Sequence, residues 1–299
     1  MQLRSISRAR IGLIIIALSA AMTGAGTSAA SPASNQALAL PTPLAFVSNL
    51  DLECFKTDTF TPPPLTTPLV LSHLNPVLAN LPREQVTLGP RTQLCAPVAK
   101  NGRIPPPGVV DFVRFVDLSC YQIRGANVNF PLVLSHLNPL LSTLPRRQLT
   151  MTVPDQLCLP VVKNNLIPPP EVLNLVRYID LKCYITQPQV PLNIGLNLAQ
   201  LNPILDGIPR ADVRVRENRQ LCVPVRKNNQ EIPPEVLRIV QWVDIEKFDI
   251  VAPPLAAPIN LRLQHINPLL TGLPVEPATL LGPAQLGLPM AKNGVIPPG

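Results

Sequence analysis

Apolar positions along the chain fall in short runs that return in the same order about every 64 residues, as in a tandem repeat. The run from Val176 to Ile185 is rich in β-branched and aromatic residues and predicts a strand. The run from Pro131 to Leu141 predicts a strand and then a turn, because the residue before Pro139 avoids the helical region; a short helix is the alternative. Two further strands are predicted over Gln148 to Val153 and Gln156 to Val162.

Turn signals separate these runs. Lys-Asn-Gly at Lys100–Gly102 and again at Lys292–Gly294 predicts a tight turn with positive φ. The Ile-Pro-Pro stretch that follows predicts an extended link to the next repeat, and Pro-Pro-Glu before Val172 and Val236 is compatible with a single helical turn. The 39 prolines are regularly placed in a chain that is 46% hydrophobic, so we interpret them as loop punctuation rather than disorder.

The resulting prediction is a mainly β protein of four tandem repeats. Each repeat is expected to be a small sandwich-like or open-barrel unit of about four short strands, and the units are expected to stack in a row. The predicted organisation is a spacer over residues 31–43, then repeat 1 (44–107), repeat 2 (108–170), repeat 3 (171–234) and repeat 4 (235–299).

The cysteines occur in two recurrent strings, and repeat 4 lacks both. Lys247 and Gly287 stand in the two cysteine positions of repeat 4. Because the two cysteines are lost together, we expect each repeat to bond its own pair. The predicted disulfides are Cys54–Cys95, Cys120–Cys158 and Cys183–Cys222. Each would close a loop of about 40 residues and stabilise the fold by roughly 3–4 kcal/mol.

Two alternatives to this pairing remain at the level of sequence. Neighbouring repeats could be joined through Cys95–Cys120 and Cys158–Cys183, which would leave Cys54 and Cys222 without partners. All six residues could instead be buried free thiols. A zinc site is not expected, because no Cys-x-x-Cys or His-x₃₋₅-His spacing occurs.

The N-terminus predicts export. Arg4, Arg8 and Arg10 form a basic region, Ile11 to Met22 is apolar, and small residues precede a cleavage site near Ala30. Residues 1–30 are therefore predicted to be a signal peptide, with an N-terminal membrane anchor as the alternative. Disulfides need an oxidising compartment, so we expect a secreted, extracellular or periplasmic protein with no stable membrane span after signal removal.

Charge excludes one class of partner. The net charge is +7, and the basic residues are spread along the chain without a Lys/Arg run, so nucleic-acid binding is not expected. The expected partner is an unknown protein or a cell-envelope polymer, and no cofactor is expected.

Two strings of the repeat resemble a known family. Asp-Leu-Lys-Cys-Tyr at Asp180–Tyr184 and Leu-Cys-Val-Pro-Val-Arg-Lys-Asn at Leu221–Asn228 are similar to a family of uncharacterised secreted bacterial repeat proteins. That family has a Cys-Tyr strand and a later Leu-Cys-x-Pro-Val-x-Lys-Asn-Gly turn. The resemblance implies an extracellular β-rich domain and no assigned activity. Repeat 4 departs from the pattern, as does the His-Leu-Asn-Pro string inside the repeats.

Recurrent polar residues are the candidates for chemistry. His73, His136 and His265 share one position, which is Gln200 in repeat 3; because Gln is not a general base, we expect a structural role. An aspartate and a lysine recur in every repeat: Asp51, Asp117, Asp180 and Asp244, and Lys100, Lys163, Lys227 and Lys292. One interpretation is a hydrogen-bonded Asp with Lys on an exposed turn. The other is a row of lysines that binds an anionic polymer.

Aromatic residues also recur at fixed places. One follows the first cysteine position of each repeat: Phe55, Tyr121, Tyr184 and Phe248. Another set precedes it by five residues: Phe115, Tyr178 and Trp242. Six residues apart, the two sets are expected on one strand face, either as core or as a sugar-stacking strip. No motif of a hydrolase or phosphate-binding loop occurs. The predicted function is a non-catalytic structural or interaction protein, with a carbohydrate- or anionic-polymer-binding module as the alternative.

Overall fold

The computed structural model describes residues 38–299, so the predicted signal peptide (1–30) and most of the predicted spacer (31–43) lie outside the described residues. Each predicted repeat begins with a short helix: α1 (Pro43–Val47), α2 (Val110–Val113), α3 (Pro170–Val176) and α4 (Pro234–Val240). The Pro-Pro-Glu signals thus start helices of two turns, with proline in the first turn, where its missing N–H is tolerated. These helices begin one residue before the expected repeat boundaries at 44, 171 and 235.

Three kinds of strand follow each helix. The first strands are β1 (Leu52–Thr57), β5 (Leu118–Gln122), β8 (Leu181–Gln187) and β11 (Ile245–Val251). The second strands are β2 (Leu69–His73), β6 (Phe130–His136), β9 (Gly195–Gln200) and β12 (Ile259–His265). The long strands are β7 (Arg147–Lys163), β10 (Ala211–Lys227) and β13 (Glu276–Lys292). In repeat 1 the long strand is divided into β3 (Glu84–Val86) and β4 (Arg91–Lys100), and Pro76–Leu78 form one 3₁₀ turn.

The mainly β prediction is confirmed, and two element boundaries differ from the sequence expectation. The strands expected separately over Gln148–Val153 and Gln156–Val162 form the single strand β7, because Pro154 is accommodated at a bulge where the register against β8 shifts. The strand expected from Val176 begins only at Leu181, because Val176 ends α3 and the next residues turn.

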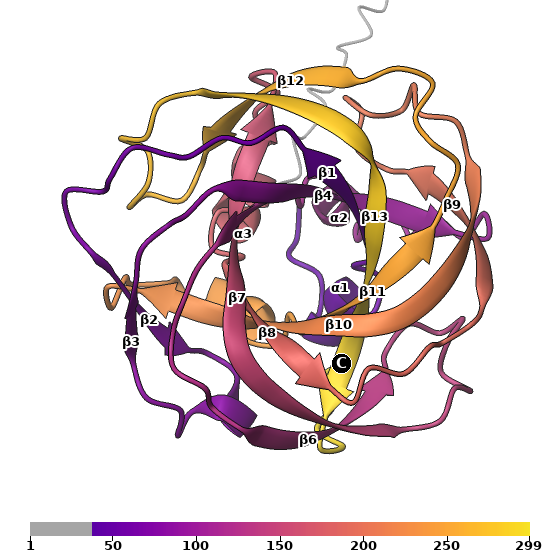
Figure 1. The fold of residues 1–299 in the computed structure, drawn as a ribbon, viewed down its shortest axis with the longest axis horizontal. Helices are drawn as coiled ribbons and strands as arrows, with labels where there is room; N and C mark the ends of the chain where they lie inside the picture. Colours follow the sequence, from indigo (N-terminus) through magenta and orange to yellow (C-terminus); the bar gives the residue numbers. More distant parts are fainter. Residues whose placement is uncertain (1–37) are drawn as a thin grey trace, which may run out of the picture. The chain divides into compact units, whose positions relative to one another are not determined.

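The first strands and the long strands form one closed antiparallel ring. Each first strand pairs with the long strand of its own repeat and with that of the preceding repeat. The ring closes because β1 in repeat 1 pairs with β13 in repeat 4. Figure 1 shows these strands circling a common centre, with the yellow C-terminal β13 beside the indigo β1.

The second strands join repeats that lie opposite each other in the ring. β2 pairs with the end of β10, β6 with β13, β9 with β4, and β12 with β7. The turn after each long strand extends this contact: Asn101 donates its backbone N–H to the Asn197 carbonyl and accepts the Asn197 N–H on its side chain. Asn101 (φ 50°) and Gly102 (φ 72°) have the positive φ that the sequence predicts.

This pairing corrects the expectation of self-contained units stacked in a row. Every repeat shares ladders with both neighbours and with the opposite repeat, so no repeat has a complete sheet of its own. The physical reason is that a unit of about 64 residues buries a smaller share of its surface and is only marginally stable on its own core, so burial against the other repeats adds stability. The edges of each repeat are therefore paired by the other three rather than left open.

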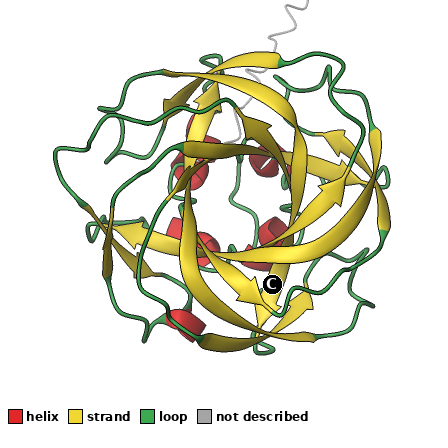
Figure 2. Cartoon of the chain, in the orientation of Figure 1, coloured by secondary structure: helices red, strands yellow, loops and turns green. Residues whose placement is uncertain are grey.

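The core has a central part and four outer parts. The six cysteines lie in one cluster with apolar residues of the four helices, which gather around the centre of the ring in Figure 2. Four outer clusters lie between the ring and the second strands, and each holds one of the aromatic residues Phe55, Tyr121, Tyr184 and Phe248. Among residues 38–299, no helix is long and apolar enough to cross a membrane.

Candidate functional site

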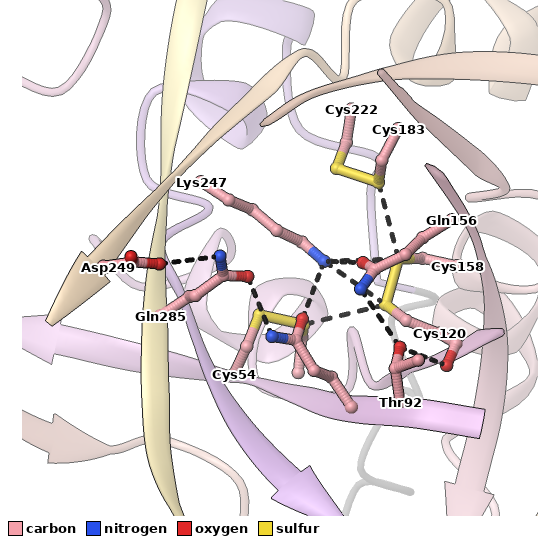
Figure 3. Close-up of a disulfide and its surroundings, with 12 residues drawn as sticks. Cys54, Thr92, Cys120, Gln156, Cys158, Cys183, Cys222, Lys247, Asp249 and Gln285 are labelled. Carbon is pink, nitrogen blue, oxygen red and sulfur yellow. Dashed lines mark hydrogen bonds between the residues drawn. A yellow bond between two sulfur atoms is a disulfide. The ribbon is translucent and has the colours of Figure 1, made fainter. Parts of the chain in front are cut away.

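The three predicted disulfides are present inside the ring (Figure 3). Cys54–Cys95, Cys120–Cys158 and Cys183–Cys222 each join residues that face each other on paired strands. The rival partners are neighbours without being bonded: Cys95 Sγ lies 3.8 Å from Cys120 Sγ, and Cys158 Sγ lies 3.7 Å from Cys183 Sγ. The six sulfurs therefore form a continuous buried row around three quarters of the ring.

Lys247 lies next to the row of sulfurs, at the first of the two positions where repeat 4 lacks its cysteines. Its ammonium group donates to Gln156 Oε1 (2.8 Å) and Gln93 Oε1 (3.1 Å), and lies 3.6 Å from the sulfurs of Cys120 and Cys158. Figure 3 shows the side chain extending across the interior toward these groups. Burial lowers the pKa of Lys247 to about 7. Lys247 thus links repeat 4 to repeats 1 and 2, and makes up with hydrogen bonds for the missing bridge.

The loss of the second cysteine has a steric counterpart. A Cβ at Gly287 would lie 2.6 Å from Ile245 Cγ2, which is too close. In the other repeats the residue at the position of Ile245 is a leucine (Leu52, Leu118 or Leu181), which is not branched at Cβ. Repeat 4 therefore differs at three positions that belong to one packing arrangement.

We predict that a fourth disulfide forms in the triple variant Ile245→Leu, Lys247→Cys, Gly287→Cys. Positions 247 and 287 face each other in the register that the three bridged pairs share. The oxidised triple variant should exceed the variant Ile245→Leu, Lys247→Ala, Gly287→Ala, which keeps the same three native bridges, in free energy of unfolding by roughly 3–4 kcal/mol, the value expected for a loop of about 40 residues. Mass spectrometry after alkylation without reductant, together with urea unfolding, measures both quantities.

The double variant Lys247→Cys, Gly287→Cys is the matched control. It keeps Ile245 and should oxidise less completely, because the added Cβ meets Ile245 Cγ2. A folded triple variant that keeps two free thiols under oxidising conditions would contradict this account of repeat 4.

The recurrent aspartates and lysines form four buried ion pairs, one within each repeat: Asp51–Lys100, Asp117–Lys163, Asp180–Lys227 and Asp244–Lys292. In repeat 2, burial raises the pKa of Asp117 and lowers that of Lys163, while their mutual attraction opposes both shifts. The lysine side chains are at most 1% exposed. The expected lysine row for an anionic polymer is therefore wrong, because each ammonium group turns inward to its aspartate.

A residue that the sequence analysis passed over completes each cluster. The asparagine of the Asn-Pro turn donates to the aspartate of the preceding repeat: Asn75 to Asp244, Asn138 to Asp51, Asn202 to Asp117 and Asn267 to Asp180, at 2.7–2.9 Å. Its side-chain oxygen accepts the backbone N–H two residues later, as Asn202 does from Ile204. The recurrence of Asn-Pro in all four repeats was the available signal.

The histidine positions mark a second set of contacts, between opposite repeats. Burial lowers the pKa of His73 and His136 to about 3, so both rings are neutral at neutral pH. His73 Nε2 lies 2.9 Å from the Tyr184 hydroxyl, and the His136 ring stacks on Phe248. These contacts are those of core residues, in agreement with the structural role expected from sequence.

A further contact between opposite repeats lies beside each histidine position. It joins the residue before the first cysteine position of one repeat to the first residue of the long strand of the opposite repeat. In repeat 1, where the long strand is divided, that first residue is Glu84 of β3. Lys182 pairs with Glu84, and Glu246 pairs with Arg147. The third contact contains Ser119, and here Glu276 accepts from the Tyr121 hydroxyl (2.7 Å) and pairs with Arg91 (3.1 Å). In these three contacts every buried charge has an opposite charge beside it.

The fourth contact is different. Glu53 is 4% exposed, and its partner is the neutral amide of Gln200, whose Nε2 donates to Glu53 Oε2 at 2.5 Å. Ala211 occupies the position that Arg147 holds in repeat 2. A cavity of about 200 Å³ lies here, lined by Glu53, Gln200 and apolar residues that include Leu198 and Ile208. Burial raises the pKa of Glu53 to about 7.

The recurrent aromatic residues do not form an exposed strip. Phe55, Tyr121, Tyr184 and Phe248 are fully buried. Phe115, Tyr178 and Trp242 lie in the turn after each helix, not on the strand, and pack partly buried against the central core. The core interpretation is therefore confirmed for the first set.

Comparisons with known proteins add no relative to this description. No family model, no curated protein and no solved structure matches the chain. Among residues 38–299, one group of side chains is close enough to share a metal ion, Cys158, Cys183 and Cys222, and all three sulfurs are in disulfides. Disulfides are typical of compartments outside the cytoplasm, and the three here indicate such a location.

Proposed function

We propose that this protein is secreted and acts as a rigid, non-catalytic structural or interaction protein. The observation that carries the proposal is the use made of the residues that recur in all four repeats. The aspartate of each repeat pairs with the lysine of the same repeat and accepts from the asparagine of the following repeat, all inside the fold. Within the described residues, the recurrent aspartates, lysines and asparagines thus hold the ring together, which supports a structural rather than a catalytic use of them.

Covalent and topological closure support the same proposal. The ring is closed between the first and the last repeat, and three buried disulfides tie its strands. A closed sheet leaves few free edges for unwanted pairing, which suits a protein that persists outside the cell. The alternative of a carbohydrate- or anionic-polymer-binding module loses most of the residues proposed for it. The four lysines and the rings of Phe55, Tyr121, Tyr184 and Phe248 are buried, and Phe115, Tyr178 and Trp242 pack partly buried against the central core.

The test is to express the full chain with its own N-terminus, separate the cell fractions, and measure free thiols. The expected result is an exported protein without free thiols that sediments saturably with the producing cell's envelope or retains one component of the medium. Protein that has been reduced and unfolded is the control. Binding that fails for both forms would limit the role to a structural spacer. A cytoplasmic protein with six free thiols would overturn the proposal.

A further inference from the structure

Four equivalent contacts join opposite repeats. In the contact at Glu53, the buried carboxyl group has no opposite charge beside it, unlike the buried charges of the other three contacts. In repeat 4 the equivalent carboxylate, Glu246, is neutralised by Arg147. In repeat 3 the charges are reversed, with Lys182 beside Glu84. The ring has pseudo-fourfold arrangement, so these contacts show what chemistry the site at Glu53 can hold: a cationic nitrogen against the carboxylate.

Two polar side chains, Glu53 and Gln200, line the place where that nitrogen is missing. Glu53 supplies a carboxylate on the wall of the cavity, and the side-chain oxygen of Gln200 is a buried acceptor without a hydrogen-bond partner. An unpaired buried acceptor costs free energy, which a donor from a ligand would recover. A protonated amine has several N–H donors and a positive charge, so it matches both oxygens at once.

The rest of the wall is apolar. Leu198, Ile208 and Leu255 line the cavity together with prolines from two loops, of which Pro253 and Pro254 are adjacent in the chain. At about 200 Å³ the cavity is smaller than the roughly 300–1,000 Å³ of sites for drug-sized molecules. The ligand is therefore small, with an apolar body behind its charged group.

Arg210 is the second charged residue that lines the cavity. It is exposed, and within the described part of the chain it makes no ion pair with Glu53. Because the positive charge of Arg210 repels a cation in the cavity, we expect this side chain to weaken amine binding.

From these contacts we propose that the cavity bounded by Glu53 and Gln200 binds a small organic cation, a primary amine on an apolar body. The ammonium group donates to the Glu53 carboxylate and to Gln200 Oε1, and the apolar body contacts Leu198, Ile208 and the loop prolines. The site takes the place of the basic side chain that repeat 2 supplies at Arg147. Amine binding at this site is separate from the proposed structural role, because export of the protein and closure of the ring do not depend on a bound amine.

The experiment is titration of the oxidised protein with n-hexylamine, with n-hexanol as the neutral probe of similar shape, followed by NMR or calorimetry. Saturable amine binding at least about tenfold tighter than that of the alcohol is expected, because a charge-assisted hydrogen bond is gained. Glu53→Gln should weaken amine binding about tenfold or more, and Arg210→Ala should strengthen it. Binding should also weaken as the pH falls below about 7, because Glu53 then takes up a proton and loses its charge.

Two further variants make the result specific. Ala211→Arg places a guanidinium group at the position of Arg147 and should abolish amine binding by filling the cavity and pairing with Glu53. Glu246→Gln changes the equivalent carboxylate, which is already paired, and should leave amine binding unchanged. Folded wild-type protein without saturable amine binding, or binding that survives both Glu53→Gln and Ala211→Arg, would overturn the proposal.

Discussion

Reduction of the three disulfides is expected to remove most or all of the stability of the folded ring. Each bridge closes a loop, with sequence separations of 41, 38 and 39 residues. By the chain-entropy relation, each such loop contributes roughly 3–4 kcal/mol. Three bridges together reach roughly 10 kcal/mol, within the total of about 5–15 kcal/mol that is typical of a folded domain. Thermal and urea unfolding followed by circular dichroism, with and without dithiothreitol, measures the difference.

Burial of the sulfurs adds an expectation about rate. The cysteines are at most 1% exposed, so dithiothreitol should reach them only after the ring opens. The three bridges should then be reduced together, at the rate of unfolding. The variant Cys54→Ala, Cys95→Ala is the control, because it keeps two bridges and should lose only about a third of the effect. A reduced protein with an unchanged unfolding midpoint would show that the bridges contribute nothing.

Breaking one buried ion pair is expected to cost at least as much as losing one disulfide. Lys163→Met should lower the free energy of unfolding by about 3–5 kcal/mol, because Asp117 then remains buried without its cation. The loss should grow as the pH rises: a carboxyl whose folded pKa is raised contributes stability at low pH, where it is protonated, and loses it as the pH rises. Urea unfolding at several pH values measures both effects.

A double-mutant cycle separates the pair from its surroundings. The double variant Asp117→Leu, Lys163→Met should cost clearly less than the sum of the two single variants, because no lone charge stays buried. Arg219→Met is the matched control at a surface pair, since Arg219 and Asp249 are 40% and 33% exposed, and it should cost less than about 1 kcal/mol. Additive effects at Asp117 and Lys163 would contradict the coupling of these two residues.

The local features followed from the sequence because they depend on residues that are close in the repeat or that change together. Repeat 4 lacks the cysteines at both positions that Cys54 and Cys95 hold in repeat 1. This joint loss identified the disulfide partners, because one cysteine alone cannot form a bridge within its repeat. The turn at Asn101 and Gly102 followed from the backbone preferences of these residue types. The β class followed from short apolar runs bounded by prolines.

Only the tertiary structure decided how the repeats join and which way their polar groups face. Pairing of β1 with β13 and of β2 with β10 joins segments far apart in the chain, and a repeat pattern is the same whether units stack in a row or close in a ring. Lys163 looked like an exposed turn residue, but it ends a strand beside Asp117 and is covered by the opposite repeat. The cavity at Glu53 could not be predicted from the sequence either. That Glu53 faces the neutral Gln200 of repeat 3, and no basic residue, depends on how opposite repeats pair.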